Sequence, residues 1–376
     1  MEKVLLIVVN DPGFFLSHRL EIALAAKKNG YVVHVASMKG GAVDVIRELG
    51  FLHHELPFSR SGRNPLKELL VLYFLWRLLW KIRPDLLHLV TIKPVIYGGI
   101  AARLAPVGGV VAAVSGLGFV FLSRGVKAVA LRKFVVFFYR VAFGKRNLKV
   151  IFQNSDDRDL LVSLGALEYS RSILIRGSGV DLSHYENTFE RSGVPIVCLA
   201  ARLLRDKGVV EFVEAAKLLR ARGVSATFQL IGDIDPGNPT TITEEELKLW
   251  REEGVVQLLG FRKDVAQLFA HAHVVTLPSY REGLPKVLVE AAACGRAVVT
   301  TDVPGCRDAI DVGKSGLLVP VQDAGALAAA LELLITNSVM RRRMGEAGRV
   351  LAEREFAVEK IVQQHLSIYR NLELSV

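Results

Sequence analysis

The chain has 376 residues, of which 51% are hydrophobic and 23% are charged, and its formal net charge is +10. This length is too great for one ordinary hydrophobic core and predicts two domains of roughly 100 to 200 residues each. The composition is that of a folded globular protein, which excludes a disordered or fibrous chain. Cys198, Cys294 and Cys306 lie far apart without CxxC spacing, so a disulfide scaffold and a cysteine zinc site are not expected.

The first half alternates apolar runs with helical patterns. VLLIVVN, at residues 4–10, predicts a buried strand and not a signal peptide. Helical spacing follows over Ser17–Asn29, and a second strand is predicted at Tyr31–Ala36. The most apolar segment, 69–80, spans about a dozen residues, whereas a membrane-spanning helix needs about 20. Three later runs, Leu86–Val90, Gly109–Ser115 and Val150–Gln153, extend a parallel sheet.

The second half repeats this organisation. IVCLAAR at residues 196–202 predicts a strand, a helix follows at Val209–Arg222, and the later apolar runs are ATFQLIG, VVQLLG, VVTLPS and AVVTT. We therefore predict an α/β protein of two Rossmann-like, doubly wound parallel-sheet domains, 1–185 and 186–355. Residues 180–195 are expected to hold the linker, and residues 356–376 a closing helix that packs back towards the first domain. Ligands of such sheets bind at the carboxyl ends of the strands, so a cleft between the two domains is the expected site.

Charge is divided unequally between the two domains. Residues 1–185 hold 25 Lys and Arg against 13 Asp and Glu, a net charge of +12, while residues 186–376 have a net charge of −2. The basic half is therefore expected to face an anionic partner such as nucleic acid, a phosphorylated substrate or acidic lipid.

The segment Pro278–Gly295, PSYREGLPKVLVEAAACG, carries the most informative motif. Glu282 and Glu290 are eight residues apart, and an EGLP turn precedes a helix predicted over Lys286–Ala293. Gly283, Leu284 and the first amides of this helix can donate to a polar ligand. A vicinal diol, as in a ribose or a sugar ring, suits each carboxylate, because an ionised carboxylate only accepts hydrogen bonds.

These residues resemble a known family. The E-x7-E element in SYREGLPKVLVEAAACG, ARLLRDKG at 201–208, LLGFRKDV at 258–265 and VVTTDVPGCRDAI at 298–310 are similar to glycosyltransferase family 4, retaining enzymes of the GT-B fold. TIKPVIYGGIAARL at 91–104 and VSGLGFVF at 114–121 resemble its bacterial branch that adds hexosamines to lipid-diphosphate-linked saccharides, including transferases that place N-acetylgalactosamine on undecaprenyl-diphosphate sugars.

The resemblance implies where the nucleotide sugar binds. Arg202 and Lys207 follow a strand, and a guanidinium with an ammonium suits the diphosphate that leaves when a nucleotide sugar is cleaved. The matching family positions bind the donor diphosphate. Glu290 is expected to hold the ribose, and Glu282 to approach the transferred sugar, so Arg202, Lys207 and Glu282 are the predicted catalytic residues. The predicted donor-binding residues are Gly13, Phe261, Arg262, Gly283, Leu284, Pro285 and Glu290.

The expected acceptor site lies in the first domain. His18 and Arg19 begin a predicted helix, and Lys93 would place a cation near the acceptor diphosphate. Other relatives carry a histidine after the strand that here reads VVAAVSGLG, whereas this chain has Ser115, Gly116 and Gly118. The predicted acceptor-binding residues are His18, Arg19, Lys93 and Ser115. Many relatives also have two adjacent glycines where this chain has Gly13 followed by Phe14.

No metal or other cofactor is expected. His271 and His273 form an HxH pair without a third ligand nearby, so both are interpreted as structural, and His88 as a core histidine. No aspartate motif for a divalent ion is evident, and Arg202 with Lys207 can take over the electrostatic role of a metal.

Two segments of the basic half, Leu66–Ile82 and Phe119–Lys149, mix aromatic and basic residues as interfacial helices do on anionic lipid. An ordinary amphipathic core helix is the alternative reading. Nucleic acid is not an expected partner, because no recognised binding module is present. The basic side chains of the second segment are Lys127, Arg132, Lys133, Arg140, Lys145 and Arg146.

The resulting hypothesis is a cytoplasmic enzyme, peripheral to the inner face of a bacterial cell membrane. It would move a sugar, an N-acetylhexosamine by the branch resemblance, from a UDP-sugar to a polyprenyl-diphosphate-linked saccharide with retention. Two alternatives stay open: a UDP-N-acetylhexosamine epimerase of similar fold, and a non-catalytic membrane protein that binds sugar nucleotides.

Overall fold

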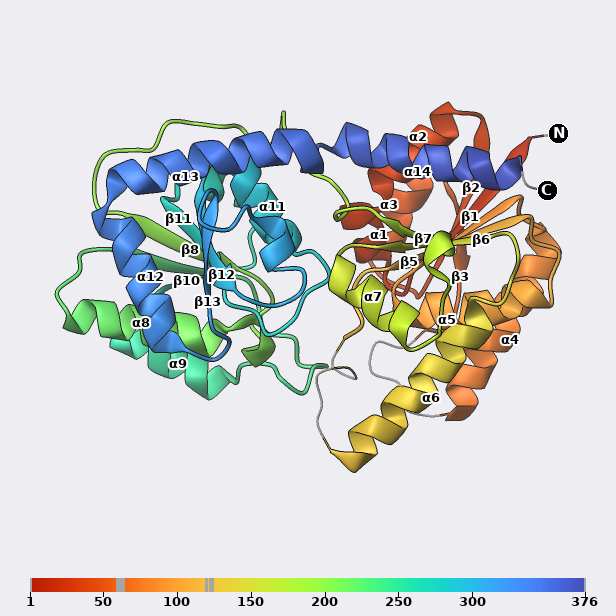
Figure 1. The fold of residues 1–376 in the computed structure, drawn as a ribbon, viewed down its shortest axis with the longest axis horizontal. Coiled ribbons are helices and arrows are strands. Elements are labelled where there is room, and N and C mark those ends of the chain that lie inside the picture. The colour runs from red at the N-terminus through yellow and green to blue at the C-terminus, as the bar shows by residue number, and fades with distance from the viewer. Residues whose placement is uncertain (1, 59–64, 119–120, 122–124, 375–376) are drawn as a thin grey trace. The chain divides into compact units, whose positions relative to one another are not determined.

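The structure is a computed structural model that describes residues 2–58, 65–118, 121 and 125–374. The chain divides into two compact units, each built on its own parallel sheet (Figure 1). The first unit contains residues 1–178 together with 359–376, and the second contains residues 179–358. The two sheets confirm the predicted fold class.

The first unit has a seven-stranded sheet with the order β3-β2-β1-β4-β5-β6-β7, and every paired strand is parallel. The order reverses beside β1, as in other doubly wound sheets. Its strands are β1 (Lys3–Val8), β2 (Tyr31–Ser37), β3 (Leu52–Glu55), β4 (Leu86–Val90), β5 (Gly109–Val114), β6 (Leu148–Phe152) and β7 (Ser172–Leu174). Its helices are α1 (Pro12–His18), α2 (Leu20–Lys28), α3 (Val43–Glu48), α4 (Pro65–Ile82), α5 (Ile92–Arg103), α6 (Val126–Ala142), α7 (Ser155–Ser163) and α14 (Val358–Glu373), with a 3₁₀ turn at Tyr169–Arg171.

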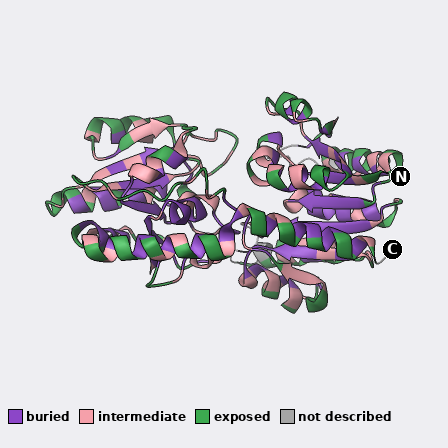
Figure 2. Ribbon diagram, turned by 90° about the horizontal axis from the view of Figure 1, so that it is seen from above, coloured by how far each residue is buried: buried purple, intermediate pink, exposed green. Residues whose placement is uncertain are grey.

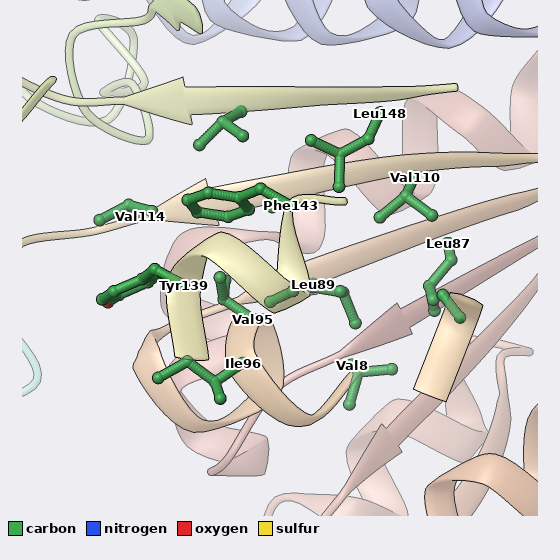
Figure 3. Packing of buried hydrophobic residues seen from close by; sticks show 14 of the residues in the cluster. Val8, Leu87, Leu89, Val95, Ile96, Val110, Val114, Tyr139, Phe143 and Leu148 are labelled. Atoms are coloured by element: carbon green, nitrogen blue, oxygen red, sulfur yellow. The ribbon is translucent and has the colours of Figure 1, made fainter. Parts of the chain in front are cut away.

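Both faces of this sheet are covered by helices. Alternate residues of a strand point to opposite faces, so Leu6 and Val8 of β1 pack with α4, α5 and α6, whereas Leu5 and Ile7 pack with α1, α2 and α14. Figure 3 shows the first of these cores, in which Val95 of α5 and Tyr139 of α6 lie over the strands. The closing helix α14 is therefore part of the core of the first unit.

The second unit has a six-stranded parallel sheet with the order β10-β9-β8-β11-β12-β13. In both units the central strands are buried, and the helices alternate buried with exposed positions (Figure 2). Its strands are β8 (Ile196–Ala200), β9 (Thr227–Ile231), β10 (Gln257–Gly260), β11 (Val274–Leu277), β12 (Ala297–Thr301) and β13 (Gly316–Val319). Its helices are α8 (Val209–Ala221), α9 (Glu244–Glu253), α10 (Val265–His271), α11 (Lys286–Ala293), α12 (Ala324–Thr336) and α13 (Ser338–Leu351), with short turns at Arg205–Lys207, Arg307–Ala309 and Ala352–Phe356.

The structure corrects one predicted helix. The pattern over Ser17–Asn29 predicts a single helix, but α1 begins earlier, at Pro12, and ends at His18, and α2 begins at Leu20. The break is at Arg19, whose backbone (φ −130°, ψ −6°) is not helical. The Asp11 carboxylate accepts hydrogen bonds from the amides of Gly13 and Phe14, which starts α1 within what the pattern suggests is a loop.

The amphipathic segment at Leu66–Ile82 forms the single helix α4, which buries Val71, Leu75 and Leu79 along one face. Helix α6 falls within the second segment, although residues 119, 120 and 122–124 and the side chain of Lys127 lie outside the described part. No helix in the described ranges is long and apolar enough to cross a membrane.

Candidate active site

The loop that follows β8 is held against the loop that follows β11. The Asp206 carbonyl oxygen accepts a hydrogen bond from the Tyr280 amide (2.9 Å) and one from the Ser279 hydroxyl (3.0 Å). Gly208 has φ +72°, and a Cβ there would lie 2.2 Å from the Pro278 carbonyl oxygen, so no larger residue fits. This contact places Lys207 at the carboxyl ends of two neighbouring strands.

Lys207 forms an ion pair with Glu282, and the Ser279 hydroxyl donates to the same carboxylate oxygen (2.7 Å). Both charged side chains are largely shielded from solvent. The loop after β12 packs closely against the Glu282 backbone, since a Cβ on Gly305 would lie 2.6 Å from the Glu282 carbonyl oxygen. The structure thus brings together two of the three predicted catalytic residues, a cation and a carboxylate in a rigid, shielded setting.

Arg202, the third predicted catalytic residue, follows β8 and pairs with Asp235 in the loop after β9 (2.7 Å). Its side chain is 59% exposed. Such an exposed pair contributes little to stability and leaves the guanidinium accessible to an anionic ligand. Arg202 and Lys207 belong to one loop but have different carboxylate partners in the described structure.

Glu290 lies in the second turn of α11 and is 8% exposed. The Tyr185 hydroxyl donates to its Oε1 atom (2.5 Å), and the Lys286 ammonium lies 3.4 Å from the same atom. Burial raises the pKa of Glu290, and Lys286 and the Tyr185 hydrogen bond partly oppose that rise. Tyr185 was missed by sequence reasoning, because it lies in a polar segment that resembles a linker and no motif marks it.

The other predicted donor residues occupy two loops. Gly283, Leu284 and Pro285 are buried directly before α11, and no side chain caps the start of that helix. Phe261 follows β10 and is 68% exposed, so its ring is accessible for stacking. Arg262 is bound to Asp264 (2.5 and 2.8 Å).

In the first unit, Gly13 and Arg19 already form hydrogen bonds within the protein. The Gly13 amide donates to Asp11 (2.8 Å), which does not favour its predicted contact with the donor. Arg19 is only 2% exposed, and burial lowers its pKa to about 10. Its guanidinium donates to the His18 carbonyl oxygen (2.8 Å) inside the unit, so its position does not favour the predicted contact with the acceptor. His18 stacks on Phe14 and is half-buried.

Lys93 and Ser115 lie at the carboxyl ends of the neighbouring strands β4 and β5. The Lys93 ammonium pairs with Glu68 of α4 (2.7 Å), and the Tyr97 hydroxyl donates to the other oxygen of that carboxylate (2.8 Å). Glu68 and Tyr97 are site neighbours that the sequence pattern does not reveal, because Glu68 comes from a different helix.

His273 and His88 have internal contacts. The two ring nitrogens of His273 lie within hydrogen-bond distance of the Ile196 amide (3.0 Å) and the Arg191 carbonyl oxygen (2.9 Å). His88 is fully buried, with Nδ1 2.6 Å from the Tyr369 hydroxyl. Across the residues that the structure describes, no group of three or more His, Cys, Asp or Glu side chains could hold a metal ion.

Both halves of the chain match families of sugar-transferring enzymes. Residues 194–337 match the family described as glycosyl transferases group 1. Residues 3–154 match the family described as glycosyl transferase 4-like. The two matches cover β1 to β6 of the first unit and all six strands of the second.

Similar proteins are found over nearly the full length. The chain is 29% identical to the N,N'-diacetylbacillosaminyl-diphospho-undecaprenol alpha-1,3-N-acetylgalactosaminyltransferase of Campylobacter jejuni, over 94% of this chain and 97% of that protein. It is 25% identical to the UDP-Gal:alpha-D-GlcNAc-diphosphoundecaprenol alpha-1,3-galactosyltransferase of Escherichia coli, over 73% and 72% of the two chains. Among solved structures, Anabaena HepE in complex with UDP matches with a TM-score of 0.76 at 20% identity, over 99% of this chain and 100% of that chain. At that identity the likeness concerns the fold alone.

Proposed function

Because the chain combines a glycosyl transferase 4-like region, residues 3–154, with a group 1 glycosyl transferase region, residues 194–337, we propose that it is a retaining glycosyltransferase with a UDP-sugar donor. Its acceptor in this proposal is a polyprenyl-diphosphate-linked saccharide, and the transferred sugar an N-acetylhexosamine. The relatives from C. jejuni and E. coli, whose names specify undecaprenyl-diphosphate-linked substrates, support this choice.

One observation supports the proposed binding of the donor: Lys207 is paired with Glu282 in a shielded setting at the ends of β8 and β11. A lysine at this position can exchange its ion pair with Glu282 for an ion pair with an incoming diphosphate. Arg202, on the same loop and accessible, supplies a second cation. Two cations aimed at a diphosphate stabilise the charge that develops on it as the sugar departs.

In the proposed reaction, the bond between the anomeric carbon and the diphosphate oxygen breaks, and UDP leaves with the electron pair. The acceptor hydroxyl forms a new bond to the same face of that carbon, and its proton passes to the departing diphosphate. Both steps use one face of the sugar ring, so the anomeric configuration is retained. In this proposal Glu282, beside Lys207, binds a hydroxyl of the transferred sugar.

Transfer is expected to survive EDTA, because Arg202 and Lys207 neutralise the leaving diphosphate in place of a divalent ion. Initial rates of product formation would be compared with and without excess chelator. Loss of activity that magnesium or manganese restores would contradict this role for the two cations.

The donor and acceptor are tested by a screen of UDP-sugars against short polyprenyl-diphosphate saccharides, with products identified by mass spectrometry and NMR. Transfer from a UDP-N-acetylhexosamine to such an acceptor is the expected result. Release of an epimerised UDP-sugar without an acceptor, or no product from any pair, would contradict the proposal.

The proposal includes docking on an anionic membrane surface. Exposed apolar side chains gather on two helices of the first unit, where α5 packs against both α4 and α6. The sequence has no acidic residue between Asp85 and Asp156, so the cations of this region are not balanced within it. Interfacial helices combine these two properties. The exposed apolar residues are Leu66, Leu69, Leu70, Tyr73, Phe74 and Trp80 on α4, and Val129, Leu131, Phe134 and Phe137 on α6.

Replacing Phe134 and Phe137 together by serine is expected to weaken sedimentation with anionic liposomes, because their rings are 60% and 57% exposed on α6. Activity on a long-chain acceptor should fall, while activity on a short soluble acceptor should be kept. Binding of the parent should also decline with salt, as screening shortens from about 10 Å at 0.1 M to about 3 Å at 1 M.

The matched control replaces Val339 and Val350, which are exposed to similar extents on α13 of the second unit, by serine. This control should bind liposomes as the parent does. If the phenylalanine variant also sediments like the parent, α6 is not the membrane contact. Neutralising Arg132, Lys133 and Arg140 is a less specific test, because Arg140 also donates to the carbonyl oxygens of Leu164 and Gly165.

A further inference from the structure

Three neighbouring strands of the first sheet are followed by side-chain oxygens without partners. Asn10 follows β1, Thr91 follows β4 and Ser115 follows β5. The Asn10 Oδ1, Thr91 Oγ1 and Ser115 Oγ atoms are each buried from solvent and have no hydrogen-bond partner in the described structure. Buried polar atoms normally have hydrogen-bond partners, so three unpaired oxygens at one edge of one sheet require an explanation.

The sheet register places the three residues side by side. Val8 of β1 pairs with Leu89 of β4, so Asn10 falls level with Thr91. Val90 pairs with Ala113 of β5, which places Ser115 one residue beyond the level of Thr91. Adjacent strands lie about 4.8 Å apart. All three residues therefore lie at the carboxyl edge of β1, β4 and β5.

Thr91 is held in an unfavourable conformation there. Its backbone has φ +74° and ψ 165°, a region that is essentially restricted to glycine. It occupies the N-cap position of α5, where a threonine normally accepts a hydrogen bond from the helix, yet its side chain makes no capping bond. The Thr91 amide donates to the Ala113 carbonyl oxygen (3.3 Å), and the Thr91 carbonyl oxygen accepts from the Val95 amide (3.0 Å). Its hydroxyl, in contrast, gains no hydrogen bond within the described protein.

The chemistry of the three side chains defines the ligand they fit. Two hydroxyls and a carboxamide are uncharged and can both donate and accept hydrogen bonds. The neighbouring Lys93 is bound to the Glu68 carboxylate, so the cation beside this edge is balanced by an anion. A neutral, polyhydroxylated group fits such a set better than a diphosphate does.

We propose that Asn10, Thr91 and Ser115 form a subsite for the hydroxyl groups of the acceptor's terminal sugar. This inference rests on the proposed glycosyl transfer and adds to it the residues and the part of the acceptor that they bind. The sugar hydroxyls replace the missing partners, and the strained conformation of Thr91 is retained because it directs Oγ1 towards them.

The first test measures transfer kinetics of Asn10→Ala, Thr91→Ala and Ser115→Ala with the short polyprenyl-diphosphate saccharide identified by the screen. Each variant is expected to raise the acceptor KM about 3- to 10-fold, the loss that one hydrogen bond accounts for. The donor KM should not change. Thr91→Ser, which keeps the hydroxyl, should stay within about twofold of the parent, well short of the loss of that bond.

A second variant separates binding from structure. Thr91→Gly relieves the backbone strain, so its midpoint of thermal unfolding is expected to rise by about 2 to 4 °C while its acceptor KM rises as in Thr91→Ala. The matched control is Ser37→Ala at the end of the adjacent strand β2, where the hydroxyl already bonds Met38 and His53. That control should lower stability and leave the acceptor KM unchanged.

Unchanged acceptor KM in all three alanine variants, with active parent enzyme, would overturn the subsite and leave the proposed function intact. A rise in the donor KM equal to that of the acceptor KM would also overturn it, because the residues would then not act on the acceptor alone. Absence of transfer by the parent enzyme would instead count against the proposed function.

Discussion

Replacing Arg202 or Lys207 by alanine is expected to lower kcat by about 10²-fold or more. Each side chain is proposed to neutralise the diphosphate as it leaves, and removing one preorganised charge from a transition state has an effect of this order. Lys207 should show the larger loss, because its setting beside Ser279 and Glu282 is shielded, whereas Arg202 is more than half exposed. Steady-state kinetics with saturating donor and acceptor measure both effects.

The loop itself provides the control. Arg205 lies between the two cations in sequence but pairs with Glu246 of α9 (2.5 Å). Arg205→Ala should therefore keep turnover within about threefold of the parent, because an exposed ion pair contributes little. Parental turnover in both the Arg202 and the Lys207 variants, or equal losses in all three, would contradict the assigned roles.

The second large effect is expected to distinguish the roles of Glu282 and Glu290. Glu282→Gln is expected to lower kcat on the order of 10²-fold, because it removes the carboxylate that pairs with Lys207 and that is proposed to contact the transferred sugar. Glu290→Gln is expected to act chiefly on the donor KM, because this residue is proposed to hold the ribose, whose contacts do not change during transfer. Kinetics with varied UDP-sugar concentration distinguish the two.

Tyr185→Phe refines this comparison, since it removes the hydroxyl that donates to Glu290 and leaves the carboxylate in place. Its donor KM should change in the same sense as that of Glu290→Gln, with kcat largely kept. Indistinguishable kinetics for Glu282→Gln and Glu290→Gln would mean that the two roles are assigned incorrectly.

The sequence predicts the strands that are fully buried better than those at the edges. The continuous apolar runs of β1, β4, β5, β8, β11 and β12 are recognisable because both faces of a parallel sheet are covered. Leu52–Glu55 and Ser172–Leu174 were missed, since these short edge strands, β3 and β7, are partly exposed and mix polar with apolar residues. Gly316–Val319, strand β13, was missed as well, since it is also short and lies at an edge of its sheet.

The candidate site shows a similar division. Motif residues that are adjacent in sequence, such as Glu282 to Pro285, could be named from the sequence, because their loop and helix are local. Partners from distant segments could not, and Tyr185 with Glu290, or Glu68 with Lys93, became visible only in the structure. The burial of Arg19 follows from packing around α1 and α14, which no local pattern reports.

The central claim, retaining transfer from a UDP-sugar to a polyprenyl-diphosphate saccharide, is tested most directly by the anomeric configuration of the product. The enzyme would be incubated with the UDP-N-acetylhexosamine and short-chain acceptor that the screen identifies, and the new linkage would be read by NMR from the coupling between the first two ring protons. We predict an α-linkage, as in the donor. A β-linked product would contradict same-face transfer, and hydrolysis of the donor without a linked product would contradict the acceptor.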